Sequence, residues 1–157
     1  MKQAPFSLRD FTVTDVQRIP DDKTRTDIMT LELRELPMFL THDTFGITAV
    51  DADDNPQGCL CITRGEDETG VYWYCWALIT DALRKQLRWF AYVALLGVDE
   101  LAAKVETGML YALVLETDTQ AKRLMRWVGF QDTNERWCPA VDKPPYEMWL
   151  FKHVESG

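Results

Sequence analysis

The stretch LETDTQAKRLMRWVGF, residues 115 to 130, limits the possible folds more than any other part of the chain. It begins at the end of an apolar run. Thr117 followed by Gln120 has the spacing of a capping box, in which side chains satisfy the free amides of a first helical turn. Gly129 suits the left-handed position just after a helix, with Phe130 folding back onto the last turn. These residues predict a short helix that follows a strand and ends at a fixed point.

This expected helix has two distinct faces. Apolar side chains recur at helical spacing and predict a buried stripe, which consists of Ala121, Leu124, Met125 and Val128. Basic side chains predict the solvent-facing side, which consists of Lys122, Arg123 and Arg126. The helix is therefore expected to pack by one face against another layer.

Two continuous apolar runs flank a longer helical pattern. VYWYCWALI (71–79) lacks polar alternation, which is typical of a central strand covered on both faces, and MLYALVL (109–115) is a second continuously apolar run. From Asp81 to about Val105 the chain follows a helical period, and Gly97 is the position at which this helix could be split. The apolar positions of that period are Leu83, Leu87, Phe90, Ala94, Val98, Leu101 and Val105. A helix between two such strands predicts a crossover that joins parallel neighbours.

The remaining segments predict further strands and helices around this unit. Turn-forming residues separate two of the strands, which indicates an antiparallel hairpin. The expected elements are a strand over 6–12, a helical turn over 15–19, a helix over 24–36, hairpin strands over 45–50 and 58–63, and strands over 130–137 and 146–152. The order predicts an α/β layer structure with a mixed sheet. With 157 residues, 46% of them hydrophobic, the chain is expected to form a single domain over 1–157.

Charge and hydropathy narrow the classes of function. The formal net charge is −8, and the basic residues are scattered, so nucleic-acid binding through the phosphate backbone is not expected. Acidic mimicry of nucleic acid is a third option, ranked below the two functions given below. No apolar run is long enough to cross a bilayer, and residues 1–20 lack the apolar block of a signal peptide. We therefore expect a soluble, cytoplasmic protein without a membrane partner.

The cysteines and histidines do not predict a metal site. Cys59, Cys61, Cys75 and Cys138 lack the paired spacing that closes a tetrahedral zinc site, so reduced and mostly buried thiols are expected. His42 and His153 are isolated in the sequence. Neither has a partner at metal-ligand or catalytic-triad spacing.

The helix of the opening stretch carries a family resemblance. Residues 118 to 130 read Asp-x-x-Ala-x-x-x-Met-x-x-x-Gly-Phe, which resembles helix four of the GCN5-related N-acetyltransferase (GNAT) superfamily, usually Asn-x-x-Ala-x-x-x-Tyr-x-x-x-Gly-Phe. The order of expected elements resembles the same superfamily over most of the chain. In layout the chain also looks like the small acetyltransferase-like proteins of tailed bacteriophages, among them an internal virion protein family.

The resemblance implies a GNAT-like fold, with a mostly antiparallel sheet and a central parallel strand pair, and acetyl-CoA as cofactor. The pyrophosphate would lie at the start of the crossover helix, where free amides and the helix dipole favour an anion. The implied cofactor-binding residues are Ile79, Thr80, Arg84, Lys85, Arg88, Asp118, Ala121 and Lys122. Leu87 and Trp89 stand where the family has glycine or alanine. Arg84, Lys85 and Arg88 either replace that cradle with charge or form a solvated helix face.

The resemblance also implies an acid and a base. Met125 stands at the position of the family tyrosine, and a thioether cannot donate a proton. Tyr111, on the preceding strand, is the alternative acid, and Glu116, just after that strand, is the candidate base. Glu116 could equally be a solvated acid beside a helix N-terminus.

The aromatic run at 72–76 could line a pocket for an acyl group or could simply be core. Side chains alternate along a strand, so either Tyr72 and Tyr74 or Val71 and Trp73 would face a cleft. The sequence leaves both pairs open.

Two functions are consistent with these observations. The first is acetyl-CoA-dependent N-acyl transfer to an amine substrate, without a metal. The second is a catalytically silent GNAT-fold phage protein that binds a host or virion protein, with Trp127, Trp137 and Trp149 as exposed anchors. The altered phosphate loop and acid position favour the second.

Overall fold

The computed structural model describes residues 6–19, 44–138, 141–142 and 145–153. The elements, in chain order, are β1 (Ser7–Asp10), α1 (Asp15–Arg18), β2 (Thr44–Val50), β3 (Pro56–Asp67), β4 (Gly70–Ile79), α3 (Asp81–Arg84), α4 (Leu87–Lys104), β5 (Met109–Leu115), α5 (Thr119–Val128), β6 (Gln131–Trp137) and β7 (Tyr146–Lys152). The helix predicted over 24–36 lies outside the described residues. None of the described helices is long and apolar enough to span a bilayer.

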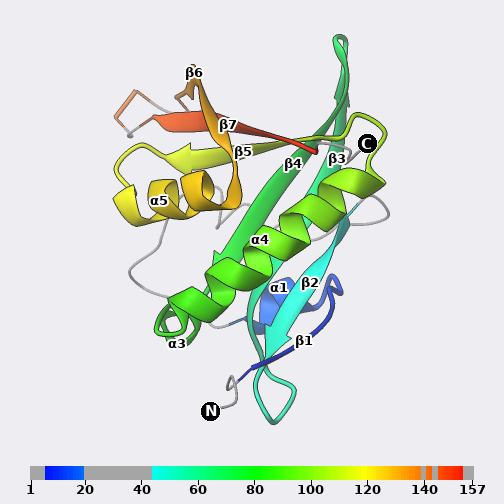
Figure 1. The fold of residues 1–157 in the computed structure, drawn as a ribbon, viewed down its shortest axis with the longest axis vertical. Helices are drawn as coiled ribbons and strands as arrows, with labels where there is room; N and C mark the ends of the chain where they lie inside the picture. The colour runs from blue at the N-terminus through cyan, green and yellow to red at the C-terminus, as the bar shows by residue number, and fades with distance from the viewer. Residues whose placement is uncertain (1–5, 20–43, 139–140, 143–144, 154–157) are drawn as a thin grey trace. The chain divides into compact units, whose positions relative to one another are not determined.

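The strands form one mixed sheet in the order β1-β2-β3-β4-β5-β7-β6 (Figure 1). β4 and β5 are parallel neighbours, whereas β1–β2, β2–β3, β5–β7 and β6–β7 are antiparallel. The predicted hairpin and the predicted parallel pair are therefore confirmed. The crossover that joins the parallel pair consists of α3 and α4.

The chain divides into two compact units, each with its own buried side chains. The first unit comprises 1–63 and 77–90, and the second comprises 64–76 and 91–157. Large buried residues of the first unit are Val16, Ile19, Leu60, Ile62, Leu78, Leu83 and Phe90. Those of the second unit are Trp73, Val98, Leu101, Leu110, Phe130, Tyr146, Trp149 and Phe151. The single domain expected from length stays a prediction.

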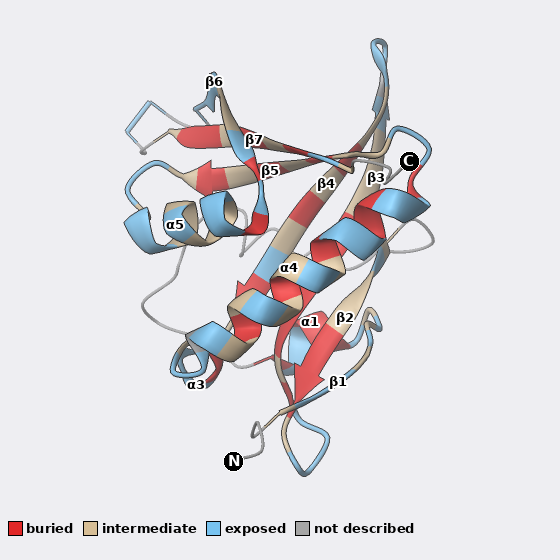
Figure 2. Ribbon diagram, viewed as in Figure 1, coloured by how far each residue is buried: buried red, intermediate tan, exposed pale blue. Residues whose placement is uncertain are grey.

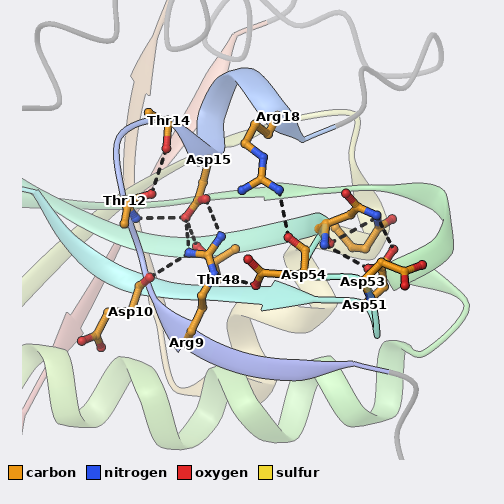
Figure 3. A network of polar contacts seen from close by, with 12 residues as sticks. Arg9, Asp10, Thr12, Thr14, Asp15, Arg18, Thr48, Asp51, Asp53 and Asp54 are labelled. Atoms are coloured by element: carbon orange, nitrogen blue, oxygen red, sulfur yellow. Dashed lines mark hydrogen bonds and ion pairs between the residues drawn. The ribbon is translucent and has the colours of Figure 1, made fainter.

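A buried carboxylate organises the start of the first unit (Figure 3). Asp15 is fully buried, and both of its oxygens accept hydrogen bonds from the Arg9 guanidinium, at 2.7 and 2.9 Å. The Thr12 amide and the Thr48 hydroxyl also donate to it, at 2.9 and 2.7 Å. Arg9 reaches Asp54 as well, at 3.3 Å. These bonds join β1, α1, β2 and the turn after β2.

Burial alone would raise the pKa of Asp15, because an isolated charge is costly in the interior. The bonds from Arg9, Thr12 and Thr48 outweigh burial, so the pKa of this carboxyl lies below its usual value. The same contacts raise the pKa of Arg9. Asp15 and Arg9 are therefore an ion pair at neutral pH.

β2 and β3 approach too closely at Gly46 for any larger residue. A Cβ on Gly46 would lie 2.3 Å from the Leu60 carbonyl oxygen and 2.6 Å from the Cys61 Sγ. Because the first of these is a backbone atom in a paired strand, it cannot turn away. We expect Gly46→Ala to lower the free energy of unfolding by about 1–3 kcal/mol in urea denaturation. Ser7→Ala on exposed β1 is the control, and an unchanged midpoint for Gly46→Ala would contradict this packing.

The crossover differs from its sequence prediction in where it breaks. The expected break at Gly97 is wrong, because Gly97 lies inside α4; the helix is interrupted at 85–86 instead. The predicted stripe is confirmed at Leu83, Phe90, Ala94, Val98, Leu101 and Val105, which are all buried. Figure 2 shows buried and exposed positions alternating along α4.

Buried and half-buried side chains alternate along β5 and along the central part of β4. In β4, Trp73 and Cys75 are buried while Tyr72 and Tyr74 are half-buried. β5 alternates strictly between buried and half-buried residues. Cover is therefore complete at one set of alternating positions and partial at the other. Tyrosine rings tolerate the partly exposed side because they combine an apolar body with a polar tip.

The start of α5 lies one residue later than the capping box predicts. Asp118, not Thr117, is the N-cap, and its Oδ1 accepts a 3.0 Å hydrogen bond from the Ala121 amide. The predicted end is confirmed: Gly129 has φ 116°, and the Phe130 amide donates to the Met125 carbonyl at 2.9 Å. The phenyl ring of Phe130 packs on Phe151, with ring centroids 5.4 Å apart.

Candidate active site

The parallel strands β4 and β5 pair at a single register position. Tyr74 of β4 pairs with Tyr111 of β5, and this is the one parallel pair found between the two strands. β5, in contrast, pairs with β7 along its whole length, from Met109 to Leu115. Tyr111 thus lies at the short junction between the parallel and antiparallel parts of the second unit.

The accessible face of β4 carries two tyrosines. The rings of Tyr72 and Tyr74 are in edge contact, with centroids 5.0 Å apart, and both residues are half-buried. Trp73, on the opposite face, is buried. Of the two pairs left open by the sequence, Tyr72 and Tyr74 are both half-buried, whereas Trp73 of the other pair is buried.

The thiol beside these tyrosines is not reactive. Cys75 is buried, and burial raises the pKa of its thiol to about 12. A thiol that stays protonated at neutral pH is a poor nucleophile. Cys59 and Cys61 are also buried and free, whereas Cys138 is exposed. Within the described ranges, no group of three or more His, Cys, Asp and Glu side chains could hold a metal ion.

The chain turns into α3 at the end of β4 through Ile79 and Thr80. Thr80 is buried and extended, its amide donates to the Gln57 carbonyl at 3.2 Å, and its hydroxyl accepts from the Leu83 amide at 3.3 Å. The Leu83 amide, which could have bound a phosphate, therefore already has the Thr80 hydroxyl as its acceptor. Because α3 has only four residues, its dipole is also small.

Among the cationic residues of this segment, Arg84 is the one whose hydrogen-bond donors are buried. Its Nε and Nη2 atoms are inaccessible to solvent and find no hydrogen-bond acceptor among the described residues. Lys85 and Arg88 are exposed. A buried N–H group without an acceptor carries a desolvation cost that a bound anion would remove. Arg84 therefore fits a phosphate ligand, although the small-residue cradle is absent.

At the start of α5 the candidate ligands are already bonded within the chain. Asp118 holds the Ala121 amide, so that amide is not free. The Lys122 ammonium forms a 3.0 Å ion pair with Glu147 of β7. Lys122 was expected on the solvent-facing side of the helix; its side chain is instead largely covered, 18% exposed.

Glu147 is a buried carboxylate that the sequence analysis missed. It is 4% exposed and lies between two cations, with Oε1 3.0 Å from Lys122 Nζ and Oε2 3.3 Å from Arg136 Nη2. Arg136 also contacts Asp132 at 3.1 Å, and this bond is the main cause of the raised pKa of Arg136. The sequence feature that could have identified Glu147 is a single acidic residue within the otherwise apolar start of YEMWLFK.

Solved structures place this architecture in a known fold. No family model and no curated protein matches the sequence. Ard1 from Thermoplasma volcanium superposes with a TM-score of 0.65 over 97% of this chain and 100% of its own, at 11% identity. A putative GNAT-family acetyltransferase from Desulfovibrio desulfuricans gives 0.64 over 94% and 98%, at 14% identity. The NatC complex bound to Gag peptide and CoA gives 0.63 over 96% and 100%, at 10% identity.

The chain has the GNAT fold. Residues 118–130, which resemble the helix-four pattern of the superfamily, run from the N-cap of α5 at Asp118 through its C-cap at Gly129 to Phe130. Met125 is half-buried, and its carbonyl accepts the amides of Gly129 and Phe130. Its side chain carries no transferable proton, so any acid in this GNAT fold must come from another element.

The two candidate acid–base residues lie far apart along β5. From Tyr111 to Leu115 the strand rises by about 13 Å, and Glu116 follows Leu115. Glu116 is exposed, and its amide donates to the Pro145 carbonyl at 3.1 Å. Tyr111 and Glu116 therefore do not meet at one hydrogen-bonding point.

Proposed function

We propose that the chain is an acetyl-CoA-dependent N-acetyltransferase of the GNAT fold that acts on an amine. The observation that carries this proposal is Arg84, whose two buried guanidinium nitrogens lack an acceptor among the described residues one turn after β4. A phosphate is the anion that a guanidinium binds with paired hydrogen bonds. The fold shared with NatC, which has been solved with CoA, makes a CoA pyrophosphate the natural candidate.

The residues divide into binding and chemical roles. Arg84 holds the pyrophosphate, with exposed Lys85 adding positive charge, and the backbone of Ile79 and Thr80 leads into that site. Acetyl-CoA, when bound, supplies the acetyl group as a thioester. We assign Tyr111 as the proton donor because it is a half-buried tyrosine on β5, at the register position that pairs with Tyr74 of β4. Glu116 is exposed, so it acts through water and by attracting a cationic amine.

Titration calorimetry with acetyl-CoA tests the proposal. We expect micromolar binding by the natural chain and at least about a tenfold weaker affinity for Arg84→Ala, since a charge-assisted contact is lost. Arg123→Ala, on the exposed face of α5, is the matched control and should bind as the natural chain does. Binding that is insensitive to Arg84, or no binding at millimolar acetyl-CoA, would refute the assignment.

A second function follows from two other observations. Met125 cannot donate a proton, and Trp127 and Trp137 are 53% and 39% exposed. These favour a catalytically silent GNAT-fold phage protein that uses tryptophans to bind a host or virion protein. The expected third anchor, Trp149, is wrong because it is only 1% exposed. Absence of acetyl-CoA binding, together with host-protein capture that is lost in Trp127→Ala, would select this function.

A further inference from the structure

One side of α5 carries positive charge and a large exposed ring. Exposed residues recur along the whole helix (Figure 2), and they are Thr119, Gln120, Arg123, Arg126 and Trp127. With 3.6 residues per turn, these five positions fall within about 120° of the helix circumference. The indole of Trp127 is 53% exposed. We call these five residues the α5 outer face.

The charges of the α5 outer face are not neutralised within the described part of the chain. Neither Arg123 nor Arg126 forms an ion pair with a carboxylate there, whereas Lys122, on the flank of the same helix, is paired with Glu147. An acidic residue three or four positions away would be the simplest partner for an exposed helix cation. Residues 119–130 contain no acidic residue. In a chain of net charge −8, this face is therefore a local region of positive charge.

The side chains of this face are arranged to contact a carboxylate next to an apolar group. The Arg126 guanidinium lies 5.4 Å from the centroid of the Trp149 ring, a cation–π contact that orients it without removing its charge. Arg123 precedes it by three residues, a spacing at which helix side chains are neighbours. A guanidinium binds a carboxylate with paired hydrogen bonds. Trp127 adds an exposed apolar ring beside both arginines.

We propose that the α5 outer face binds a short acidic segment of a partner protein. Carboxylates of the segment pair with Arg123 and Arg126, and an apolar side chain packs on Trp127. From Thr119 to Trp127 the helix rises by about 12 Å, which matches three or four residues of an extended peptide. Because such a contact is small, binding is reversible. The proposal does not rest on the proposed transferase activity.

The small extent of the positive charge favours an acidic peptide over a nucleic acid. A nucleic-acid strand carries a phosphate at every nucleotide and would run past the α5 outer face onto the surface of a chain whose net charge is −8. At physiological salt, exposed charges more than about 8 Å apart are largely screened from one another. A short segment is therefore attracted by the two arginines with little repulsion from the rest of the chain.

Selection from a random twelve-residue peptide display library on the natural chain tests the proposal. We expect the selected peptides to be rich in Asp and Glu beside an aromatic or aliphatic residue. A synthetic peptide of the consensus sequence, titrated by calorimetry, should bind at least about tenfold more weakly to Arg123→Glu and to Trp127→Ala. Lys104→Glu, the same kind of charge reversal at an exposed position of α4, is the matched control and should bind as the natural chain does.

Three results would overturn the proposal. One is a selection that enriches no acidic peptides. Another is a consensus peptide that binds equally to the natural chain and to Arg123→Glu, with circular dichroism showing the variant folded. The third is a single-stranded oligonucleotide that binds more tightly than the peptide and loses affinity in Arg123→Glu, which would assign the face to nucleic acid. Because acetyl-CoA is absent from these experiments, none of the results bears on the proposed transferase activity.

Discussion

Replacing Asp15 with alanine is expected to lower the free energy of unfolding by about 3–5 kcal/mol. Asp15 is fully buried and accepts four hydrogen bonds, two of them from Arg9. Its removal leaves the Arg9 guanidinium without its closest counter-ion and deprives the buried Thr48 hydroxyl of its acceptor. Urea denaturation followed by tryptophan fluorescence measures the loss.

Asp10→Ala is the matched control for this variant. Asp10 belongs to the same strand-to-helix segment, but its side chain is exposed (Figure 3). A substitution of this kind at the surface typically changes stability by less than about 0.5 kcal/mol. Equal losses in the two variants would show that the network around Asp15 does not stabilise the fold.

The lowered pKa of the Asp15 carboxylate also predicts how the stability of the chain depends on pH. The pKa of Asp15 is lower in the folded chain than its usual value of 3.8. The group is therefore ionised and stabilising above that usual value, and its contribution is lost as the pH falls through the folded pKa. We expect the natural chain to be more stable than Asp15→Asn at pH 7. The difference between their free energies of unfolding should decrease below about pH 4. A difference that does not depend on pH would contradict the ion pair.

Sequence reasoning predicted the framework because that framework depends on local patterns. The spacing of Leu83, Phe90, Ala94 and Val98 reflects the helical period, and all four are buried. Gly129 adopts the left-handed conformation that few other residues tolerate. Helix boundaries depend on more than local pattern, because Thr117 and Asp118 are both good caps and the three-dimensional path of the chain decides between them.

The candidate site was harder to predict because it depends on side chains from distant segments. Nothing in the sequence places Glu147 between Lys122 and Arg136, since these residues come from three different elements. The separation of Tyr111 from Glu116 follows from β5 remaining extended up to Leu115, which the sequence did predict. Arg84 was singled out by its charge, but only the structure shows that two of its nitrogens are buried without an acceptor among the described residues.

Replacing Trp149 with alanine is the second large effect that we expect, with a loss of about 3–5 kcal/mol in the free energy of unfolding. Trp149 lies on β7, which pairs with both β5 and β6, and its neighbours in register are Ala112 and Asp132. The indole is 1% exposed, and the Arg126 guanidinium lies 5.4 Å from its ring centroid. Its removal would leave a large cavity beneath α5.

Two further variants test which property of Trp149 determines the loss of stability: the volume of its ring, its indole N–H or its buried position. Trp149→Phe keeps most of the volume and removes an indole N–H that has no hydrogen-bond acceptor among the described residues, so we expect a loss of less than about 1.5 kcal/mol. Trp127→Ala removes the same side chain from an exposed site on α5 and should cost less than about 0.5 kcal/mol. Urea midpoints that decrease in the order natural chain, Trp127→Ala, Trp149→Phe, Trp149→Ala would support this account. Stability would then depend on the volume of the buried side chain at position 149. Similar midpoints for Trp127→Ala and Trp149→Ala would refute it, because burial would then not determine the cost of losing the indole.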